Sequence, residues 1–211
     1  MQVVIAGGHG KVALELTRVL TRRGDEVRSL IRNPAHAGDV RQAGGHAVIA
    51  DLESTGDELA LVVGRADAAV FAAGAGPGSG PERKETVDYA AAVKLIRAAE
   101  ANRIRRYVMV SAMGADARAG VGPMGPYLQA KGRADDALRA SGLDFTIVRP
   151  GHLTDVPGTG LVTLGESVAP GQIPRADVAE VIAAVLSQPA TIGRTFEVVG
   201  GDRPIGAALD A

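Results

Sequence analysis

The stretch Val3-Val4-Ile5-Ala6-Gly7-Gly8-His9-Gly10-Lys11-Val12-Ala13 decides the fold. Val3 to Ala6 form a short apolar run rich in β-branched residues, which is typical of a buried strand. Gly7 closes this run, and a helical apolar face follows, made by Val12, Leu14, Leu16, Val19 and Leu20. The stretch therefore predicts a strand, a glycine-rich turn and a helix in immediate succession.

The same alternation continues along the chain. Further strands are predicted at residues 27–31, 47–50, 68–73, 107–110, 145–148 and 195–199. Helices are predicted at residues 35–43, 59–63, 84–101, 127–140 and 177–186. Buried strands that alternate with helices predict an α/β fold, a doubly wound (Rossmann) parallel sheet with helices on both faces. We expect a single domain over residues 1–211, with a small irregular segment at 152–174 on the substrate side.

Two Gly/Pro-rich stretches, residues 74–82 and 114–126, follow predicted strands. In this architecture ligand-facing loops lie at the carboxyl ends of the strands. We expect these loops to border the site, although plain surface loops would have the same composition.

Composition excludes several classes of protein. A formal net charge of −1 and 3% aromatic residues offer neither a basic field nor stacking surfaces for nucleic acid. No apolar run is long enough to cross a membrane, and no signal-peptide pattern is present. We therefore expect a cytoplasmic monomer or homodimer that acts on a small-molecule substrate, with no nucleic-acid or membrane partner. The chain has no cysteine and its histidines lack metal-ligand spacing, so we also expect no metal site.

The glycine turn carries the strongest chemical signal, because it follows a strand and opens a helix. Gly7 permits the tight turn, Gly10 lets the backbone approach a pyrophosphate, and Ala13 allows close packing of the helix on the strand. The helix N-terminus then offers free N–H groups and the positive end of a dipole. We expect the turn to bind a dinucleotide through Gly7, His9, Gly10, Lys11 and Val12.

The end of the second predicted strand bears on the choice between NAD and NADP. An acidic residue there would bond the ribose 2′-hydroxyl, but the sequence is Ile31-Arg32-Asn33. The guanidinium of Arg32 can pair with a 2′-phosphate, which favours NADP(H); a solvated surface arginine is the alternative. At the end of the third strand, Asp51 could accept a hydrogen bond from the adenine amino group while Leu52 packs on the ring. A helix N-cap role is the alternative for Asp51.

A second group of residues indicates reduction chemistry. Tyr127 and Lys131 are spaced i, i+4 on a predicted helix and therefore share one face. A nearby ammonium and a cationic nicotinamide would lower the phenol pKa, which makes Tyr127 a candidate proton donor to a carbonyl oxygen. Ser111 ends the fifth strand and could hold that oxygen. The alternative is that Tyr127 only packs at the start of its helix.

These motifs resemble the short-chain dehydrogenase/reductase superfamily, in particular its atypical, single-domain NAD(P)H-binding branch, related to flavin/biliverdin-reductase-like and NmrA-like proteins. The matching elements are Gly7-x-x-Gly10-x-x-Ala13, Ala72-Ala73-Gly74, Val110-Ser111-Ala112-Met113-Gly114-Ala115, Tyr127-x-x-x-Lys131, Arg149-Pro150-Gly151 and Ile173-Pro174-Arg175-x-Asp177. The resemblance implies that Ala72, Ala73 and Gly74 lie beside the adenine ribose. It also implies that Lys131 bonds the nicotinamide ribose, and that Pro150 to Leu153, with His152 among them, contact the carboxamide.

Together these features predict an NADPH-dependent oxidoreductase that transfers hydride to a small carbonyl or conjugated substrate. Its catalytic residues would be Ser111, Tyr127 and Lys131. The alternative is a non-catalytic NADP(H) redox sensor that binds a protein partner, because members of the atypical branch vary in whether they keep the tyrosine.

Overall fold

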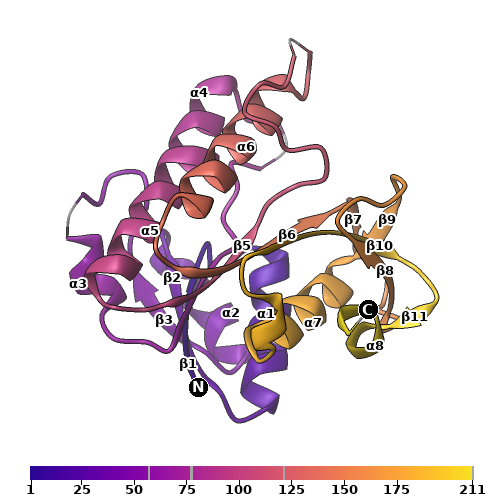
Figure 1. Cartoon of the computed structure of the whole chain (residues 1–211). Coiled ribbons are helices and arrows are strands. Elements are labelled where there is room, and N and C mark those ends of the chain that lie inside the picture. The colour runs from indigo at the N-terminus through magenta and orange to yellow at the C-terminus, as the bar shows by residue number, and fades with distance from the viewer. Residues whose placement is uncertain (57, 77, 121, 211) are drawn as a thin grey trace.

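The computed structural model describes residues 1–56, 58–76, 78–120 and 122–210. A nine-stranded sheet forms its centre, with the strand order β11-β8-β10-β6-β5-β4-β1-β2-β3 (Figure 1). The strands are β1 (Gln2–Ala6), β2 (Glu26–Ile31), β3 (His46–Ile49), β4 (Ala68–Phe71), β5 (Arg106–Val110), β6 (Asp144–Pro150), β8 (Leu161–Gly165), β10 (Arg194–Gly200) and β11 (Arg203–Pro204). From β3 to β10 all neighbours are parallel, while β8 and β11 extend the sheet in antiparallel pairing. This mostly parallel sheet confirms the predicted α/β fold.

Helices cover both faces of the sheet, as predicted (Figure 1). Two helices that are far apart in the sequence, α1 and α7, pack against each other on one face. On the opposite face α5 packs against α3 and α6. The helices are α1 (Lys11–Arg22), α2 (Ala37–Gln42), α3 (Leu59–Val63), α4 (Pro81–Arg83), α5 (Ala91–Ala101), α6 (Gly125–Arg139), α7 (Arg175–Leu186) and α8 (Ile205–Leu209), with short 3₁₀ turns at Pro34–His36 and Pro189–Thr191.

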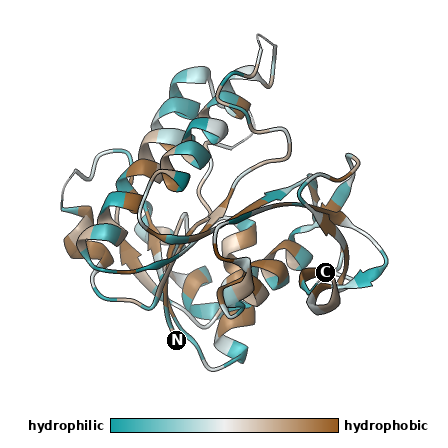
Figure 2. Ribbon diagram, in the orientation of Figure 1, coloured by the Kyte–Doolittle hydropathy of each residue, from teal (hydrophilic) through white to brown (hydrophobic). Residues whose placement is uncertain are grey.

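Strand β1 lies inside the sheet and contributes to both hydrophobic cores. Val3 and Ile5 pack into the core beneath α1 and α7, whereas Val4 and Ala6 pack into the core beneath α5. Side chains alternate between the two faces of a strand, so a strand with helices on both sides must be apolar at every position. Figure 2 shows the consequence, a band of hydrophobic strands between helices that are hydrophobic on one side.

Several elements differ from the sequence prediction at their ends. Strand β4 ends at Phe71 instead of residue 73, so the next residues are free to line a cavity. The helix predicted at 84–101 begins as α4, continues as a π-helical stretch, Lys84–Ala90, and only then becomes α5. Residues 57 and 121 lie outside the described part of the chain, as does residue 77 within the first Gly/Pro-rich loop.

The prediction that residues 152–174 are irregular is wrong. The segment contains β8 and a separate two-stranded parallel sheet, β7 (His152–Thr154) with β9 (Gln172–Pro174). The backbones approach closely here: the His152 N–H donates to the Gly171 carbonyl at 2.9 Å, and a Cβ on Gly151 would lie 2.4 Å from the same oxygen. Strands β7 and β8 pair with strands that are distant in the sequence. The local pattern of apolar residues therefore did not predict them.

Candidate functional site

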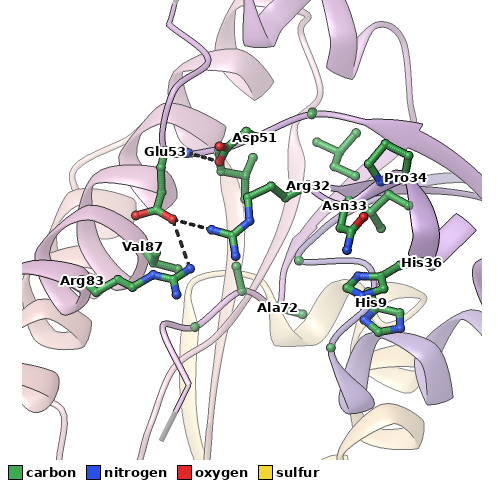
Figure 3. A pocket seen from close by; sticks show the side chains of 18 residues that line it. His9, Arg32, Asn33, Pro34, His36, Asp51, Glu53, Ala72, Arg83 and Val87 are labelled. Atoms are coloured by element: carbon green, nitrogen blue, oxygen red, sulfur yellow. Dashed lines mark hydrogen bonds and ion pairs between the residues drawn. The ribbon is translucent and has the colours of Figure 1, made fainter. Parts of the chain in front are cut away.

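A cavity of about 690 Å³ opens at the carboxyl ends of β1 to β4 (Figure 3). In an open parallel sheet this edge is where ligands bind. Most of the residues predicted to bind the cofactor line it, namely Gly7, His9, Gly10, Arg32, Asp51, Leu52, Ala72, Ala73 and Gly74. The cavity therefore gathers segments from four different strand ends into one concave surface.

The turn between β1 and α1 has a conformation that requires glycine. Gly7 has a φ of 78°, and a Cβ there would lie 2.6 Å from the Ala73 Cα. The turn is closed by the Gly10 N–H, which donates to the Gly7 carbonyl at 2.9 Å. It is fixed to the neighbouring strand by the Gly8 N–H, which donates to the Leu30 carbonyl at 2.9 Å. The backbone itself thus forms the floor of the cavity.

The N-terminus of α1 suits an anion. The helix begins at Lys11, its first turn contains no acidic residue, and Gly10 supplies no side-chain cap. The first N–H groups of a helix have no partner within the helix, and the dipole adds partial positive charge there. The turn and helix start together fit the pyrophosphate of a dinucleotide, because free backbone N–H groups and the positive end of the helix dipole meet there.

The other residues predicted on this turn have different surroundings. The His9 ring stacks on His36, with centroids 3.6 Å apart, and its Nε2 lies 2.7 Å from the Asp39 carboxylate. Both histidines line the cavity. Lys11 instead points to an ion pair with Asp155, and the Val12 side chain is buried in the core. Neither Lys11 nor Val12 lines the cavity, so any contact they make with a dinucleotide would come from their backbone N–H groups.

At the far end of the cavity, Arg32 contacts a carboxylate that sequence reasoning missed. Its Nη1 donates to Glu53 Oε2 at 2.9 Å, and Arg83 Nη2 donates to the same oxygen at 3.2 Å (Figure 3). Asp51 Oδ1 accepts from the Glu53 N–H at 3.0 Å, so Asp51 stabilises a turn after β3. This is close to the capping alternative, although a turn and not a helix follows. Nothing local in the sequence marked this contact, because Arg32 and Glu53 lie 21 residues apart.

Lys131 connects α6 to the cavity. Its side chain is 3% exposed, and its Nζ donates to the carbonyls of Ala73 and Val110, each at 3.2 Å. Nζ also lies 3.3 Å from Asp88 Oδ1, in a fully buried ion pair. The other Asp88 oxygen accepts from the Ala75 N–H at 3.2 Å. Asp88 thus ties Lys131 to the loop that lines the cavity.

The buried pair leads to a prediction about stability. Replacing Lys131 with alanine leaves the Asp88 carboxylate buried without its counter-charge, which destabilises a protein strongly. We expect Lys131→Ala to lower the free energy of unfolding by about 3 kcal/mol in urea titration. The double variant Lys131→Ala/Asp88→Ala should recover part of that loss. A single variant as stable as the parent would contradict the pairing.

Tyr127 lies one helical turn before Lys131 on α6, as predicted. Its surroundings differ from the expectation, because burial raises the pKa of Tyr127 to about 12, with the nearby Asp88 and Asp135 carboxylates adding to the rise. The prediction of a lowered phenol pKa is therefore wrong for this structure. Burial is the main cause, and the Lys131 ammonium that was expected to lower the pKa is paired with Asp88. The Lys84 ammonium lies 5.2 Å from the Tyr127 ring centroid.

Ser111 follows β5 and is buried, with 4% of its surface exposed. Its hydroxyl has no hydrogen-bond partner among the described residues, and a buried polar group of this kind is a common sign of a ligand-binding role. Burial raises the pKa of the Asp135 carboxyl, and Arg149 opposes this rise. Pro150, the last residue of β6, is buried, and His152 in β7 is exposed. Ser111, Tyr127, Lys131, Pro150 and His152 do not line the cavity.

Among the described residues, no cluster of three or more histidine, aspartate or glutamate residues is arranged to hold a metal ion. None of the helices in that part of the chain combines the length and apolarity needed to cross a membrane.

Fold and site together define a dinucleotide-binding protein of the Rossmann type. Residues 7–189 match the family described as NAD(P)H-binding, and the chain belongs to that family. Its motifs fit the atypical branch of the short-chain dehydrogenase/reductase superfamily. The family establishes a nicotinamide cofactor.

Several relatives extend this comparison. The chain is 37% identical over 211 residues to a Bacillus subtilis protein named an uncharacterized sugar epimerase, YhfK, and covers 99% of both chains. It is 41% identical to a solved structure from Bacillus halodurans, provisionally named an NAD-dependent epimerase/dehydratase, with a TM-score of 0.93 and coverage of 100% of this chain and 99% of the other. It is also 31% identical to the chloroplastic protein TIC 62 of Pisum sativum, over 89% of this chain and 40% of that protein.

Proposed function

We propose that this protein is an NADPH-dependent oxidoreductase that reduces a small carbonyl or conjugated substrate. The observation that carries the proposal is the position of Lys131, whose ammonium bonds Ala73, a residue of the cavity wall, and Val110, the residue before Ser111. This contact holds the Tyr127–Lys131 face of α6 against the carboxyl edge of the sheet. Ser111, Tyr127 and Lys131 are thereby associated with the end of the cavity that the adenosine half would leave free.

Each residue has a distinct role in this proposal. When bound, the reduced nicotinamide supplies the hydride that adds to the substrate carbon. Tyr127 donates its phenolic proton to the substrate oxygen, and Ser111 orients that oxygen through its unpartnered hydroxyl. Lys131 positions the helix through its bonds to Ala73, Val110 and Asp88. A pKa of about 12 keeps Tyr127 protonated at neutral pH, so the phenol has a proton to donate.

Preference for NADPH over NADH follows from Arg32 at the rim of the cavity. A charged hydrogen bond from its guanidinium to the 2′-phosphate is worth roughly 1.5–3 kcal/mol. We expect NADPH to bind more tightly than NADH by about that amount, and Arg32→Ala to remove most of the difference in calorimetry. Tighter binding of NADH by the wild type would contradict the assignment.

The second candidate is an NADP(H) sensor that binds a protein partner without turnover. The observation that favours it is the match to TIC 62, where the matched region covers 40% of a longer protein. In TIC 62 the matched region is joined to additional sequence, which is typical of a binding module.

One experiment separates the two candidates. Purified protein is incubated with NADPH and a panel of aldehydes, ketones and conjugated carbonyls, and absorbance of the reduced cofactor is followed. A nucleotide sugar incubated separately with the oxidised cofactor, with its products separated by chromatography, tests the epimerase chemistry named for the B. subtilis relative, because epimerisation consumes no NADPH. Turnover that is lost in Tyr127→Phe supports the oxidoreductase. The sensor is supported if a protein partner binds with different affinity in the presence of NADPH and of NADP⁺, and no substrate is turned over.

A further inference from the structure

The carboxylate of Glu53 lies between two guanidiniums at the rim of the cavity (Figure 3). Its Oε2 accepts from Arg32, at the end of β2, and from Arg83, at the end of α4. Its Oε1 accepts from the Thr86 hydroxyl at 2.6 Å. Three segments far apart in the sequence thus converge on one carboxylate, inside the cavity that would hold the adenosine half of the cofactor.

The backbone at Glu53 is fixed as firmly as its side chain. Asp51 Oδ1 accepts from the Glu53 N–H, and Lys94 Nζ on α5 donates to the carbonyls of Leu52 and Glu53, at 3.0 and 2.8 Å. The turn therefore aims the Glu53 side chain at the two arginines.

We propose that Arg32 and Arg83 together form a binding site for a phosphomonoester, the 2′-phosphate of NADP(H), and that Glu53 fills this site until the phosphate displaces it. The inference rests on the proposed function. It adds Arg83 as a second residue that binds the 2′-phosphate, and Glu53 as a side chain that competes with the phosphate. Two guanidiniums that share one carboxylate oxygen present converging donors, the arrangement that a dianionic phosphate recognises best.

The carboxylate can leave because its ion pairs are partly exposed to solvent. The side chains of Arg32, Arg83 and Glu53 are 55%, 43% and 27% exposed. Ion pairs in such surroundings contribute little, whereas the phosphate brings more charge and more acceptor oxygens to the same donors. Glu53 therefore opposes NADPH binding through charge repulsion and competition, and leaves NADH binding nearly unaffected. The selectivity for NADPH over NADH is then set by two opposing contributions: the two arginines attract the 2′-phosphate, and the Glu53 carboxylate competes with it.

The test uses fragments that carry only the adenosine half of each cofactor. Adenosine 2′,5′-bisphosphate has the 2′-phosphate and adenosine 5′-monophosphate lacks it, so the ratio of their dissociation constants isolates the proposed site. Glu53→Gln keeps the size and the hydrogen-bonding ability of the side chain but removes the charge. We expect it to tighten binding of the bisphosphate by about tenfold, and Arg83→Ala to weaken it by about tenfold, as judged from charged hydrogen bonds. Binding of the monophosphate should stay within about twofold in both variants.

Two matched variants control for changes in surface charge. Glu58 and Arg97 are exposed and make no ion pair within the described part of the chain. Glu58→Gln and Arg97→Ala change the net charge by the same amount as the test variants, so neither should alter the ratio. Melting temperatures of all four variants show that the domain remains folded.

The outcomes separate this inference from the proposed function. Equal binding of the two fragments by the wild type overturns the NADPH preference itself. A wild-type preference that Arg32→Ala removes, but that Arg83→Ala and Glu53→Gln leave unchanged, overturns only the inference. Weaker binding of both fragments to Glu53→Gln also overturns it, because Glu53 would then support the adenosine pocket directly.

Discussion

Replacing Gly10 with valine should abolish dinucleotide binding while leaving the domain folded. Gly10 has φ and ψ of −60° and 147°, a conformation that valine adopts readily. A Cβ there would lie 3.2 Å from the Gly7 carbonyl oxygen, tight but without contact to a rigid core. The γ-methyl groups would fill the space between the turn and the N-terminus of α1, where the pyrophosphate has to lie. We expect affinity for NADPH to fall by more than about 100-fold in calorimetry.

Gly142→Val is the matched control for this variant. Gly142 is exposed between α6 and β6, and a Cβ there meets no atom within 4 Å. It should bind the cofactor as the wild type does. Unchanged affinity in Gly10→Val, with a normal melting temperature, would remove the glycine turn from the binding site.

Replacing Tyr127 with phenylalanine should lower turnover by about 10²- to 10⁴-fold, the usual contribution of a positioned proton donor. Cofactor affinity should stay the same, because Tyr127 does not line the cavity. Single-turnover hydride transfer at saturating substrate measures the effect directly. Tyr107→Phe is the matched control, since Tyr107 in β5 is fully buried and removing its hydroxyl should leave the rate unchanged. An unchanged rate in a folded Tyr127→Phe protein would exclude the phenol from the mechanism.

The pH dependence of the wild type gives a second readout of the same proton. A donor works only while it is protonated, so the rate is complete below its pKa and is lost as pH rises through it. Because burial raises the pKa of Tyr127 to about 12, the rate of reduction should not fall between neutral pH and about 10. A loss of activity centred well below 10 would show that another group supplies the proton, or that ligand binding lowers the pKa.

The strand, turn and helix at the N-terminus were predictable because their determinants are local. Val3 to Ala6 are apolar at every position, which suits a strand covered on both faces, and Gly7 is required by its own φ. The spacing of Tyr127 and Lys131 likewise depends only on helical periodicity, and α6 contains both. The sequence alone sufficed wherever neighbouring residues dictate the geometry.

Features that depend on distant contacts were not predictable. Glu53 meets Arg83 only because β3 and α4 end at the same edge of the sheet, and a single acidic residue in a turn carries no sign of that. The pairing of Lys131 with Asp88 joins two helical segments, and burial of Tyr127, with Asp88 nearby, raises the phenol pKa that was expected to fall. In both cases the charge of a side chain is balanced by a partner that only the fold brings close.

The antiparallel end of the sheet has a consequence for how copies of this chain can associate. The outermost strand, β11, consists only of Arg203 and Pro204. An exposed strand normally offers a row of unused N–H and C=O groups that can recruit a strand from another molecule. Here the row is very short, and Pro204 has no N–H to donate. Strand pairing through β11 is therefore limited by the length and the sequence of this strand.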